Sequence, residues 1–464
     1  MKKNQYSSIV IVILLLLLLT TSITSYSQYI MPEETSEHEG TWLQWPHQYT
    51  YGMFYRNSLD NTWVEMTASL QNSEKVHIIA YNLIQRDRII TLLNNANVPL
   101  TNIDFYVHEN DDVWVRDNGP MFVYDSNDDL NIIDWGFNGW GGDAPFLKCD
   151  LIPTKVSNDI SIPVMDLSAM VLEGGAIEID GKGTMMATRS SVTHSSRNPG
   201  LTESQIEEFL STYVGISNFI WLDGVYGSEI TDMHIDGFMK FANDSTIVTF
   251  NSSDLQYWEL TQNDINTLYN SVNNNGEPYN FIYVPLTQNN VVTEYGNNLG
   301  YKGSYCNYYI ANTIVLVPNY NDPNDDIANA IIQDIYPNRT VIGIDVRNLY
   351  ENGGMVHCVT QQQPVLKNST SINFNEKDEI NIGDIFPNPA NSNPKINFKL
   401  KENSLVKLDV FNMNGKQVIS IDEKEYLSGD NIIIIDIKNL NTGIYTYTVN
   451  IDNIKVQSAK MIIN

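Results

Sequence analysis

Two hydrophobic patterns divide the chain at about Gln362. From residue 30 to that point, runs with the helical period alternate with short β-rich runs. The pattern predicts helices over residues 62–70, 86–94, 202–213 and 325–335, and strands over residues 76–81, 219–222 and 340–346. Because helices and strands alternate, we expect an α/β or α+β domain.

The second pattern follows a polar, irregular stretch over residues 364–378. Alternating runs predict short strands over residues 395–400, 406–411, 417–421, 431–437 and 444–449, with turn signals such as Asn414-Gly415 between them. Regular short strands predict a small all-β sandwich. The chain is therefore expected to comprise a first domain over residues 28–362, a linker over 363–380 and a second domain over 381–464.

The N-terminus is typical of a secretory signal peptide. Two lysines precede the apolar run 9–19, and Ser25 and Ser27 are small residues placed as a cleavage site requires. No later window approaches the roughly 18 to 20 apolar residues that a membrane helix needs. We expect residues 1–27 to be removed and the rest to be exported without a membrane span.

Charge narrows the class of ligand. The formal net charge of −28 argues against nucleic acid, which is bound by basic surfaces. An acidic field favours small cationic ligands. The same charge also fits a role in solubility alone, because it is spread along the chain.

After Ser27 the chain has three cysteines, Cys149, Cys306 and Cys358. An exported protein tolerates a disulfide, and pairing Cys149 with Cys306 would leave Cys358 free. An unpaired thiol in an exported protein is a candidate nucleophile.

Cys358 follows the Gly353-Gly354 pair by four residues in the run Glu351-Asn-Gly-Gly-Met-Val-His-Cys. A cysteine after a glycine turn fits a nucleophile on a tight loop. Among Val and Met neighbours, a cysteine is more often a small core residue. The other polar motifs decide between these interpretations.

The segment Trp114-Val-Arg-Asp-Asn-Gly-Pro120 resembles the end of a strand that enters a turn, where functional side chains are common. Asp117 there is a candidate ligand for a guanidinium, because one carboxylate accepts two hydrogen bonds from that planar cation. By itself the segment is more typical of a turn-capping Asp117 with a local salt bridge to Arg116.

The segment Asp232-Met-His-Ile-Asp236 carries three polar residues at a spacing of two. Read as a strand, it places Asp232, His234 and Asp236 on one face. Two flanking acids would raise the pKa of His234 and keep it available for proton transfer. The same residue types also occur in metal sites, although no second ligand cluster accompanies them.

Two weaker candidates complete the polar inventory. Glu173 precedes the Gly174-Gly175 pair and could orient His234, as an acid orients the base of a triad. Asn307 closes the run Gly303-Ser-Tyr-Cys-Asn and could hold a loop or a polar end of the substrate.

Residues 30–365 resemble the agmatine deiminases and the Porphyromonas-type peptidylarginine deiminases. Nine segments occur in the order seen in those families: Met31-Pro-Glu-Glu, Glu39-Gly-Thr-Trp-Leu-Gln-Trp-Pro-His47, Trp114–Pro120, Asp134-Trp-Gly-Phe-Asn138 with Trp140-Gly-Gly142, Leu172-Glu-Gly-Gly175, Arg197-Asn-Pro199, Asp232–Asp236, Ser304-Tyr-Cys-Asn307 and His357-Cys-Val-Thr-Gln361. Met233 departs from the pattern, since those families often have Gly there.

The resemblance implies the pentein fold, a five-bladed α/β propeller with its active site at the centre. It implies Cys358 as the nucleophile, His234 as general acid and base, and Asp117 and Asp236 as the carboxylates that bind the guanidinium. Glu173 would be the partner of His234. Trp114 would line the pocket, and Asn307 is added as a substrate-binding candidate. The reaction needs neither metal nor cofactor.

Several activities are compatible with these residues. The amino-acid sequence of Asp134–Gly142 favours an agmatine deiminase, which gives N-carbamoylputrescine and ammonia. This segment carries no arginine that could bind a substrate carboxylate. Export favours a peptidylarginine deiminase. Free arginine as substrate, an amidinotransferase, and a guanidine-binding surface protein without turnover remain further alternatives.

The C-terminal segment resembles the Ig-like sorting domain of Bacteroidetes-type bacteria. The likeness rests on Ile385-Phe-Pro-Asn-Pro-Ala390, Val410-Phe-Asn-Met-Asn-Gly415 and Leu440-Asn-Thr-Gly-Ile-Tyr445. It implies recognition by the type nine secretion machinery, with release or surface attachment of the protein.

Overall fold

The computed structural model describes residues 29–367, 381–383, 385–400, 403–412, 416–451 and 454–464. The expected signal peptide, the Asn414-Gly415 turn and most of the expected linker lie outside these residues. The chain forms two compact units, Met1–Lys367 and Asn368–Asn464.

The described part of the first unit contains five sheets with the strand orders β17-β2-β3-β4, β1-β5-β6-β7, β10-β9-β8, β11-β12-β13 and β14-β15-β16. Their strands are β1 (Tyr29–Ile30), β2 (His38–Gln44), β3 (Lys75–Ala80), β4 (Ile103–Val107), β5 (Met121–Asp125), β6 (Leu130–Gly136), β7 (Val164–Val171), β8 (Ile177–Ile179), β9 (Thr184–Thr188), β10 (Asn218–Leu222), β11 (Met239–Asn243), β12 (Thr246–Thr249), β13 (Asn280–Tyr283), β14 (Tyr309–Ile310), β15 (Ile314–Asn319), β16 (Thr340–Asp345) and β17 (Gln361–Pro364).

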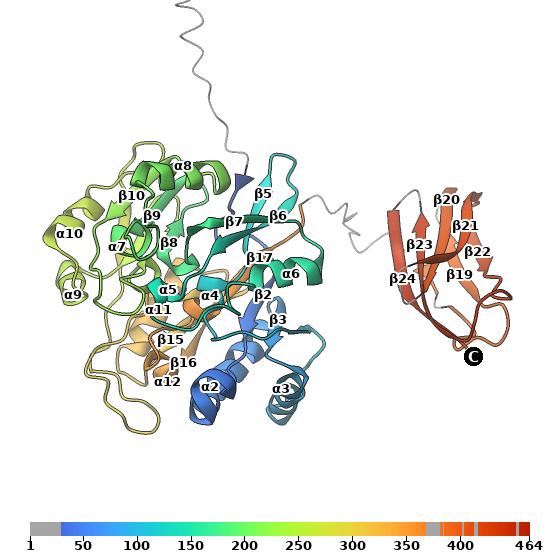
Figure 1. Ribbon diagram of the computed structural model, residues 1–464, viewed down its shortest axis with the longest axis horizontal. Helices are drawn as coiled ribbons and strands as arrows, with labels where there is room; N and C mark the ends of the chain where they lie inside the picture. Colours follow the sequence, from blue (N-terminus) through green and yellow to red (C-terminus); the bar gives the residue numbers. More distant parts are fainter. Residues whose placement is uncertain (1–28, 368–380, 384, 401–402, 413–415, 452–453) are drawn as a thin grey trace, which may run out of the picture. The chain divides into compact units, whose positions relative to one another are not determined.

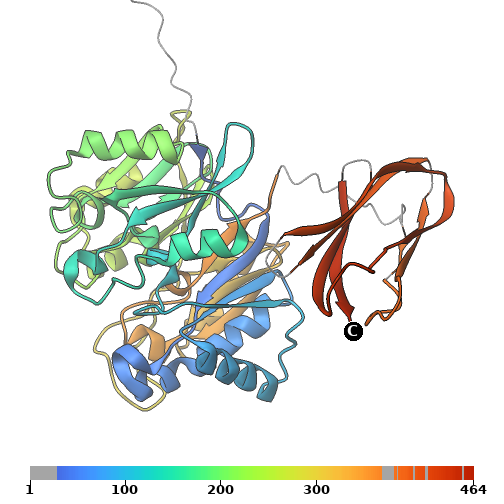
Figure 2. The same cartoon turned by 45° about the vertical axis from the view of Figure 1, so that its right-hand side comes forward.

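Helices connect these strands and lie mostly around the outside of the unit (Figures 1 and 2). They are α2 (Gln48–Leu70), α3 (Leu83–Asn95), α4 (Val115–Asn118), α5 (Gly139–Gly142), α6 (Ile152–Ile160), α7 (Arg189–Val192), α8 (Glu203–Tyr213), α9 (Ser252–Tyr257), α10 (Gln262–Tyr269), α11 (Asp325–Ile335) and α12 (Arg347–Tyr350), with the 3-10 turns η1 (Gly174–Ala176), η2 (Ile235–Gly237) and η3 (His357–Val359).

One pairing pattern recurs in all five of these sheets. An antiparallel pair is followed by a helical crossover to a parallel strand: β5-β6 then β7, β8-β9 then β10, β11-β12 then β13, β14-β15 then β16, and β17-β2 then β3. The crossover helix covers the sheet that it connects, as βαβ units do. The unit is thus a mixed α/β structure built from five similar pieces.

The hydrophobic pattern explains how a helix finds its sheet. In α2, Leu59, Trp63, Met66 and Leu70 recur at helical spacing and are fully buried. They belong to the same apolar core as residues of β3, so burial of this stripe fixes α2 against the sheet.

Most of the predicted elements are present, with changed ends. α8 begins at the predicted capping box of Thr202 and Gln205, and α11 has the predicted bounds. α2 starts well before residue 62, in a turn that is interrupted at Gly52, where φ is +87°. Gln363 and Pro364, expected in the linker, instead pair with β2.

The second unit consists of two antiparallel sheets in its described residues. One has the order β18-β19-β22 and the other β21-β20-β23-β24. The strands are β18 (Asn381–Ile382), β19 (Lys395–Leu400), β20 (Ser404–Asn412), β21 (Gln417–Tyr426), β22 (Gly429–Ile434), β23 (Gly443–Ile451) and β24 (Ile454–Ile463). Alternate residues of both sheets, such as Phe398 and Tyr447, share one apolar core.

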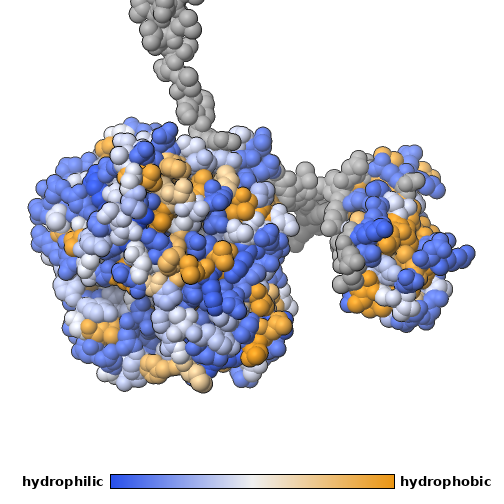
Figure 3. Space-filling model, in the orientation of Figure 1, coloured by the Kyte–Doolittle hydropathy of each residue, from blue (hydrophilic) through white to orange (hydrophobic). Residues whose placement is uncertain are grey.

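The visible surface of the first unit is mainly hydrophilic (Figure 3), in keeping with the strong net charge. None of the helices in the described residues is long and apolar enough to cross a membrane.

Candidate active site

The site is assembled from equivalent positions of the five sheets. Directly before the first strand of each antiparallel pair lies a short segment: α4 before β5, η1 before β8, η2 before β11, residues 304–307 before β14, and η3 before β17. α4 contacts both η1 and η3, and η1 contacts η2. These segments carry Asp117, Glu173 at the N-cap of η1, Asp236, Asn307 and Cys358.

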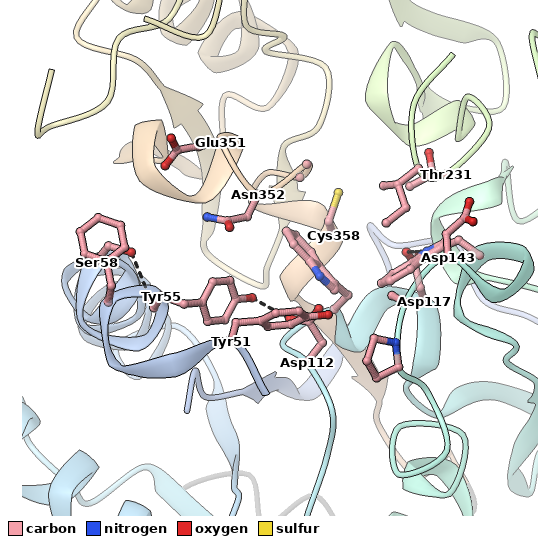
Figure 4. A pocket seen from close by; sticks show the side chains of 18 residues that line it. Tyr51, Tyr55, Ser58, Asp112, Asp117, Asp143, Thr231, Glu351, Asn352 and Cys358 are labelled. Carbon is pink, nitrogen blue, oxygen red and sulfur yellow. Dashed lines mark hydrogen bonds between the residues drawn. The ribbon is translucent and has the colours of Figure 1, made fainter. Parts of the chain in front are cut away.

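A pocket of about 490 Å³ reaches two of these segments, at Asp117 of α4 and Cys358 of η3 (Figure 4). Asp117, Trp114 and Cys358 line it. Its other aromatic and acidic lining residues are Tyr51, Phe54, Tyr55, Trp140, Asp112, Asp143 and Glu351. In Figure 4, Tyr51 and Tyr55 of α2 lie on one side of Cys358, and Asp117 lies on the other side.

Cys358 is held at the pocket wall by Asn307. The amide Nδ2 of Asn307 lies 3.3 Å from Sγ, and its Oδ1 accepts from the backbone N of His357 at 2.9 Å. Burial, together with the charges of Asp236 and Asp117, raises the pKa of the Cys358 thiol well above its ordinary value. Without a bound cation, the sulfur is therefore a thiol at neutral pH.

Asp117 is fixed by two donors from different segments. Its Oδ1 accepts from the backbone N of Gly175 at 3.0 Å, and its Oδ2 accepts from Nε1 of Trp140 at 3.0 Å. Burial raises its pKa to about 6, since the charges of Asp236 and Glu173 reinforce that effect and His234 only partly opposes it. A cationic ligand next to Asp117 would lower this pKa and keep the carboxyl ionised.

His234 lies between two carboxylates. Its Nε2 is 3.3 Å from Oε2 of Glu173, and its Nδ1 is 3.7 Å from Oδ1 of Asp117. Burial alone would lower the pKa of His234, but Asp117, Glu173 and Asp236 outweigh it and raise the pKa to about 9. The imidazole is thus protonated at neutral pH and available as an acid.

Asp236 faces Cys358 and a second histidine. Its Oδ2 lies 3.9 Å from Sγ of Cys358 and 2.8 Å from Nδ1 of His357. Burial raises the pKa of Asp236, yet the hydrogen bond from His357 and the nearby positive charges outweigh it, so the net shift is downward. Asp236 is therefore ionised next to Cys358.

The strand expected over Asp232–Asp236 is wrong. Asp232 and Met233 have φ of +58° and +71°, and η2 begins directly after His234. The turn sends Asp232 away from the imidazole, to Nη1 of Arg197 at 2.5 Å. The pKa of His234 is raised as predicted, but by Asp117, Glu173 and Asp236 instead of Asp232.

The strand end expected at Trp114 is also wrong. Trp114 is the N-cap of the one-turn helix α4, which carries Arg116 and Asp117. Arg116 does not pair with Asp117: its Nη2 lies 3.8 Å from Glu34. The local salt bridge considered as an alternative is therefore not formed.

The glycine pair before Cys358 has a packing reason. Gly353 has φ of +102°, which favours glycine, and a Cβ on Gly354 would lie 2.3 Å from the indole of Trp114. The loop can therefore pass directly over Trp114, which forms part of the pocket wall.

Three groups at the site escaped the sequence interpretation. Trp140 holds Asp117 from a left-handed turn with φ of +55°. Arg197 is fully buried and donates to Glu173 at 2.9 Å. Asp112 lines the pocket and accepts from Tyr55 at 2.6 Å, while burial raises its pKa to about 6. Trp140 and Arg197 lie within the quoted segments, but nothing local assigns them a role.

Two further alternatives from the sequence concern a disulfide and a metal site. Cys149 and Cys306 are buried free thiols, as Cys358 is a free thiol. Within the described ranges, no group of three or more His, Cys, Asp and Glu side chains is arranged to hold a metal ion.

Comparisons with known proteins identify one family for the first unit. The Porphyromonas-type peptidyl-arginine deiminase family matches residues 30–364, and the secretion system C-terminal sorting domain matches residues 384–464. A protein of Listeria monocytogenes named "putative agmatine deiminase 1" is 30% identical over 362 residues, which cover 72% of this chain and 96% of the relative.

Solved structures agree with the sequence relatives. The agmatine deiminase of Enterococcus faecalis is 25% identical with a TM-score of 0.64, covering 74% of this chain and 98% of that chain. A Porphyromonas gingivalis structure named "putative arginine deiminase" is 28% identical with a TM-score of 0.64, covering 72% and 98%. The chain thus belongs to the Porphyromonas-type peptidyl-arginine deiminase family, whose enzymes act on guanidine C–N bonds, and it carries a secretion system C-terminal sorting domain.

Proposed function

We propose that this protein is an agmatine deiminase, which hydrolyses agmatine to N-carbamoylputrescine and ammonia through a covalent intermediate on Cys358. The observation that carries the proposal is that Cys358 and Asp117 line one acidic pocket, while Asp236 lies 3.9 Å from Sγ of Cys358 and His234 lies 3.7 Å from Oδ1 of Asp117. The names of the Listeria and Enterococcus relatives support the choice of substrate.

Substrate binding follows from charge. A guanidinium between Asp117 and Asp236 donates to both carboxylates and offsets their repulsion. Its carbon then faces Sγ of Cys358, which lies 3.9 Å from Oδ2 of Asp236. The cation also favours the thiolate, so binding is coupled to loss of the thiol proton.

The first half of the reaction breaks the C–N bond. The thiolate of Cys358 attacks the guanidinium carbon and forms a C–S bond. His234, which is protonated below about pH 9, gives its proton to the departing nitrogen, so that ammonia leaves and an S-alkylthiouronium remains on the enzyme.

The second half regenerates the enzyme. His234, now neutral, accepts a proton from a water that attacks the same carbon. Collapse of the tetrahedral intermediate breaks the C–S bond, releases the ureido product and returns Cys358. Glu173 stabilises each imidazolium form through its contact with Nε2 at 3.3 Å.

The lining of the pocket favours an amine at the distal end of the substrate. Asp112, Asp143 and Glu351 line the pocket in addition to Asp117, whereas no Lys or Arg is among its described lining residues. A substrate carboxylate would lack a cationic partner, and an ammonium group would meet acids and aromatic rings. Agmatine fits this lining better than free arginine does.

A peptidylarginine deiminase is the second candidate. The sorting domain favours it, and so does the exposed apolar side chain of Phe54 at the pocket, which is 67% exposed. A flanking peptide could contact such a side chain. An arginine inside a peptide has no free carboxylate, so the acidic lining does not exclude this class.

For the whole chain, we propose the following organisation. Residues 1–27 are a signal peptide, the first unit is a five-bladed pentein propeller over about 28–364, and the second is an Ig-like sandwich after a linker. The recurrence of one pairing pattern in five sheets supports the propeller, and the two antiparallel sheets support the sandwich. Export by the type nine route would place the enzyme outside the cell or on its surface.

One comparison tests the proposed function. Ureido product and ammonia are measured with agmatine, free arginine, an internal arginine peptide and a C-terminal arginine peptide. Agmatine should exceed the C-terminal arginine peptide in kcat/KM by about tenfold or more, because an uncompensated carboxylate costs about 1.4 kcal/mol or more. Preference for the internal peptide would establish the second candidate, and guanidine binding without ammonia would indicate a non-catalytic protein.

A further inference from the structure

His357 lies between the carboxylates of Asp236 and Glu34. Its Nδ1 is 2.8 Å from Oδ2 of Asp236, and its Nε2 is 2.7 Å from Oε2 of Glu34. The histidine is 2% exposed and directly precedes Cys358. It therefore connects the guanidinium-binding side of the site to an acid that does not line the pocket.

Glu34 is an ionised carboxylate in this arrangement. Lys240 donates to its Oε2 at 3.0 Å, and the backbone N of Ile310 donates to its Oε1 at 2.8 Å. Burial raises the pKa of Glu34, but Lys240, His357 and Arg116 outweigh it and hold the pKa well below its ordinary value. Asp236 is ionised as well, because its pKa is lowered.

Ionised carboxylates only accept hydrogen bonds. A doubly protonated His357 would donate to both neighbours, from Nδ1–H to Asp236 and from Nε2–H to Glu34. Its backbone is anchored too, because its N donates to Oδ1 of Asn307 and its O accepts from Nε of Arg116 at 3.3 Å.

We propose that Glu34 and His357 form a positioning pair for the substrate-binding carboxylate: Glu34 holds His357 as an imidazolium, and its Nδ1–H keeps Asp236 charged and turned toward the guanidinium. This role rests on the proposed function, since it takes Asp236 to be a ligand of the substrate cation. Neither residue touches the substrate, so both act through Asp236.

A purely structural role of this buried cluster is the competing explanation, and charge distinguishes the two. A positioning pair should strengthen binding of a cationic ligand and have little effect on binding of a neutral ligand of the same shape, because it acts by keeping Asp236 charged. A structural defect weakens both ligands. Agmatine and N-carbamoylputrescine form such a pair, since they differ only in the guanidinium or ureido end.

The experiment measures binding of both ligands by calorimetry to the full chain in a Cys358→Ser background, which prevents turnover. Glu34→Gln removes the charge that faces His357. His357→Asn keeps a donor near Asp236 but removes the positive charge. Glu178→Gln is the matched control, because Glu178 is the other acid bonded to Lys240, at 3.0 Å, and its side chain is 8% exposed against 12% for Glu34.

We expect Glu34→Gln and His357→Asn each to weaken the binding of agmatine by about tenfold, or about 1.4 kcal/mol, and the binding of N-carbamoylputrescine by less than about twofold. The control should leave both ligands within about twofold. Equal weakening of the two ligands, or equal effects of Glu34→Gln and Glu178→Gln, would overturn the proposal. If Glu34→Gln does not fold, the two ligand affinities of His357→Asn decide alone.

Failure of the proposed function gives a different result. In that case agmatine does not bind to the Cys358→Ser background at all. An acylated arginine amide and its citrulline counterpart then provide the charged and neutral ligands, and the same variants test the positioning pair with them.

Discussion

Gly175 approaches His234 so closely that a Cβ at this position would lie 2.8 Å from the imidazole Nδ1. The same Cβ would lie 2.9 Å from Oδ1 of Asp117 and 3.0 Å from Oδ2 of Asp236. No side chain fits at this point, because the side chains of His234, Asp117 and Asp236 converge on it. The glycine is therefore required by the site itself.

Gly175→Ala should reduce kcat/KM by at least about a hundredfold, because displacement of reacting groups by about 1 Å costs that much. The fold should persist, since the collision is with side chains. Gly237→Ala is the control: its Cβ would meet only Trp258, at 3.8 Å, among described neighbours within 4 Å. Kinetics and thermal unfolding of both variants check this, and an active Gly175→Ala would contradict the geometry.

Cys358→Ala and Cys358→Ser should abolish turnover, because only a thiolate attacks the carbon and later leaves it readily. Mass spectrometry of the wild-type enzyme quenched during turnover should find the adduct on the peptide that contains Cys358. Substantial turnover by the alanine variant would remove the covalent mechanism.

Asp117→Asn and Asp236→Asn should each lower kcat/KM by orders of magnitude. Each change preserves shape but removes a charge that pairs with the guanidinium, and loss of a buried charge partner costs about 2–5 kcal/mol. Steady-state kinetics measure the effect. Near-parental efficiency of either variant would exclude that residue from substrate binding.

The protonation of His234 predicts how activity depends on alkaline pH. Its pKa is raised to about 9, so the acid form should be lost, and kcat should fall, as the pH rises through about 9. Glu173→Gln removes one of the charges that raise this pKa, so the alkaline limb should move to lower pH.

Asp232→Asn is the matched control for that shift. Asp232 and Glu173 both pair with the buried Arg197, so both variants should lose stability. Of these two acids, only Glu173 contacts His234, at 3.3 Å. The alkaline limb should therefore shift in Glu173→Gln and not in Asp232→Asn. A limb that stays in place in Glu173→Gln, measured from kcat against pH, would contradict the assigned role.

Truncation near residue 370 should leave a folded, active enzyme, because the five sheets and the site residues all precede Lys367. Export should fail instead, since the sorting domain is removed. Activity of the purified first unit and localisation in the native host test this. A folded but inactive first unit would show that the second unit contributes to the site.

Elements with a strong periodic signal were predictable because local burial decides them. α11 and β19 have the predicted bounds, and α8 begins at its capping box. The turn at Asp232–Asp236 was not, because a spacing of two fits a strand as well as a turn, and neither was the one-turn helix at Trp114–Pro120. Tertiary contacts, such as Asp232 with Arg197, select the turn.

By itself, the sequence determined the chemical inventory: a thiol, an imidazole and acids in ordered segments, and an alternation of helices and strands followed by short strands. Only the tertiary structure decided which of these groups meet. Residues between 117 and 358 converge because five similar sheets each present the segment before the first strand of the antiparallel pair. No local pattern encodes that convergence, and burial together with neighbouring charges then sets the protonation of Cys358, His234 and Asp236.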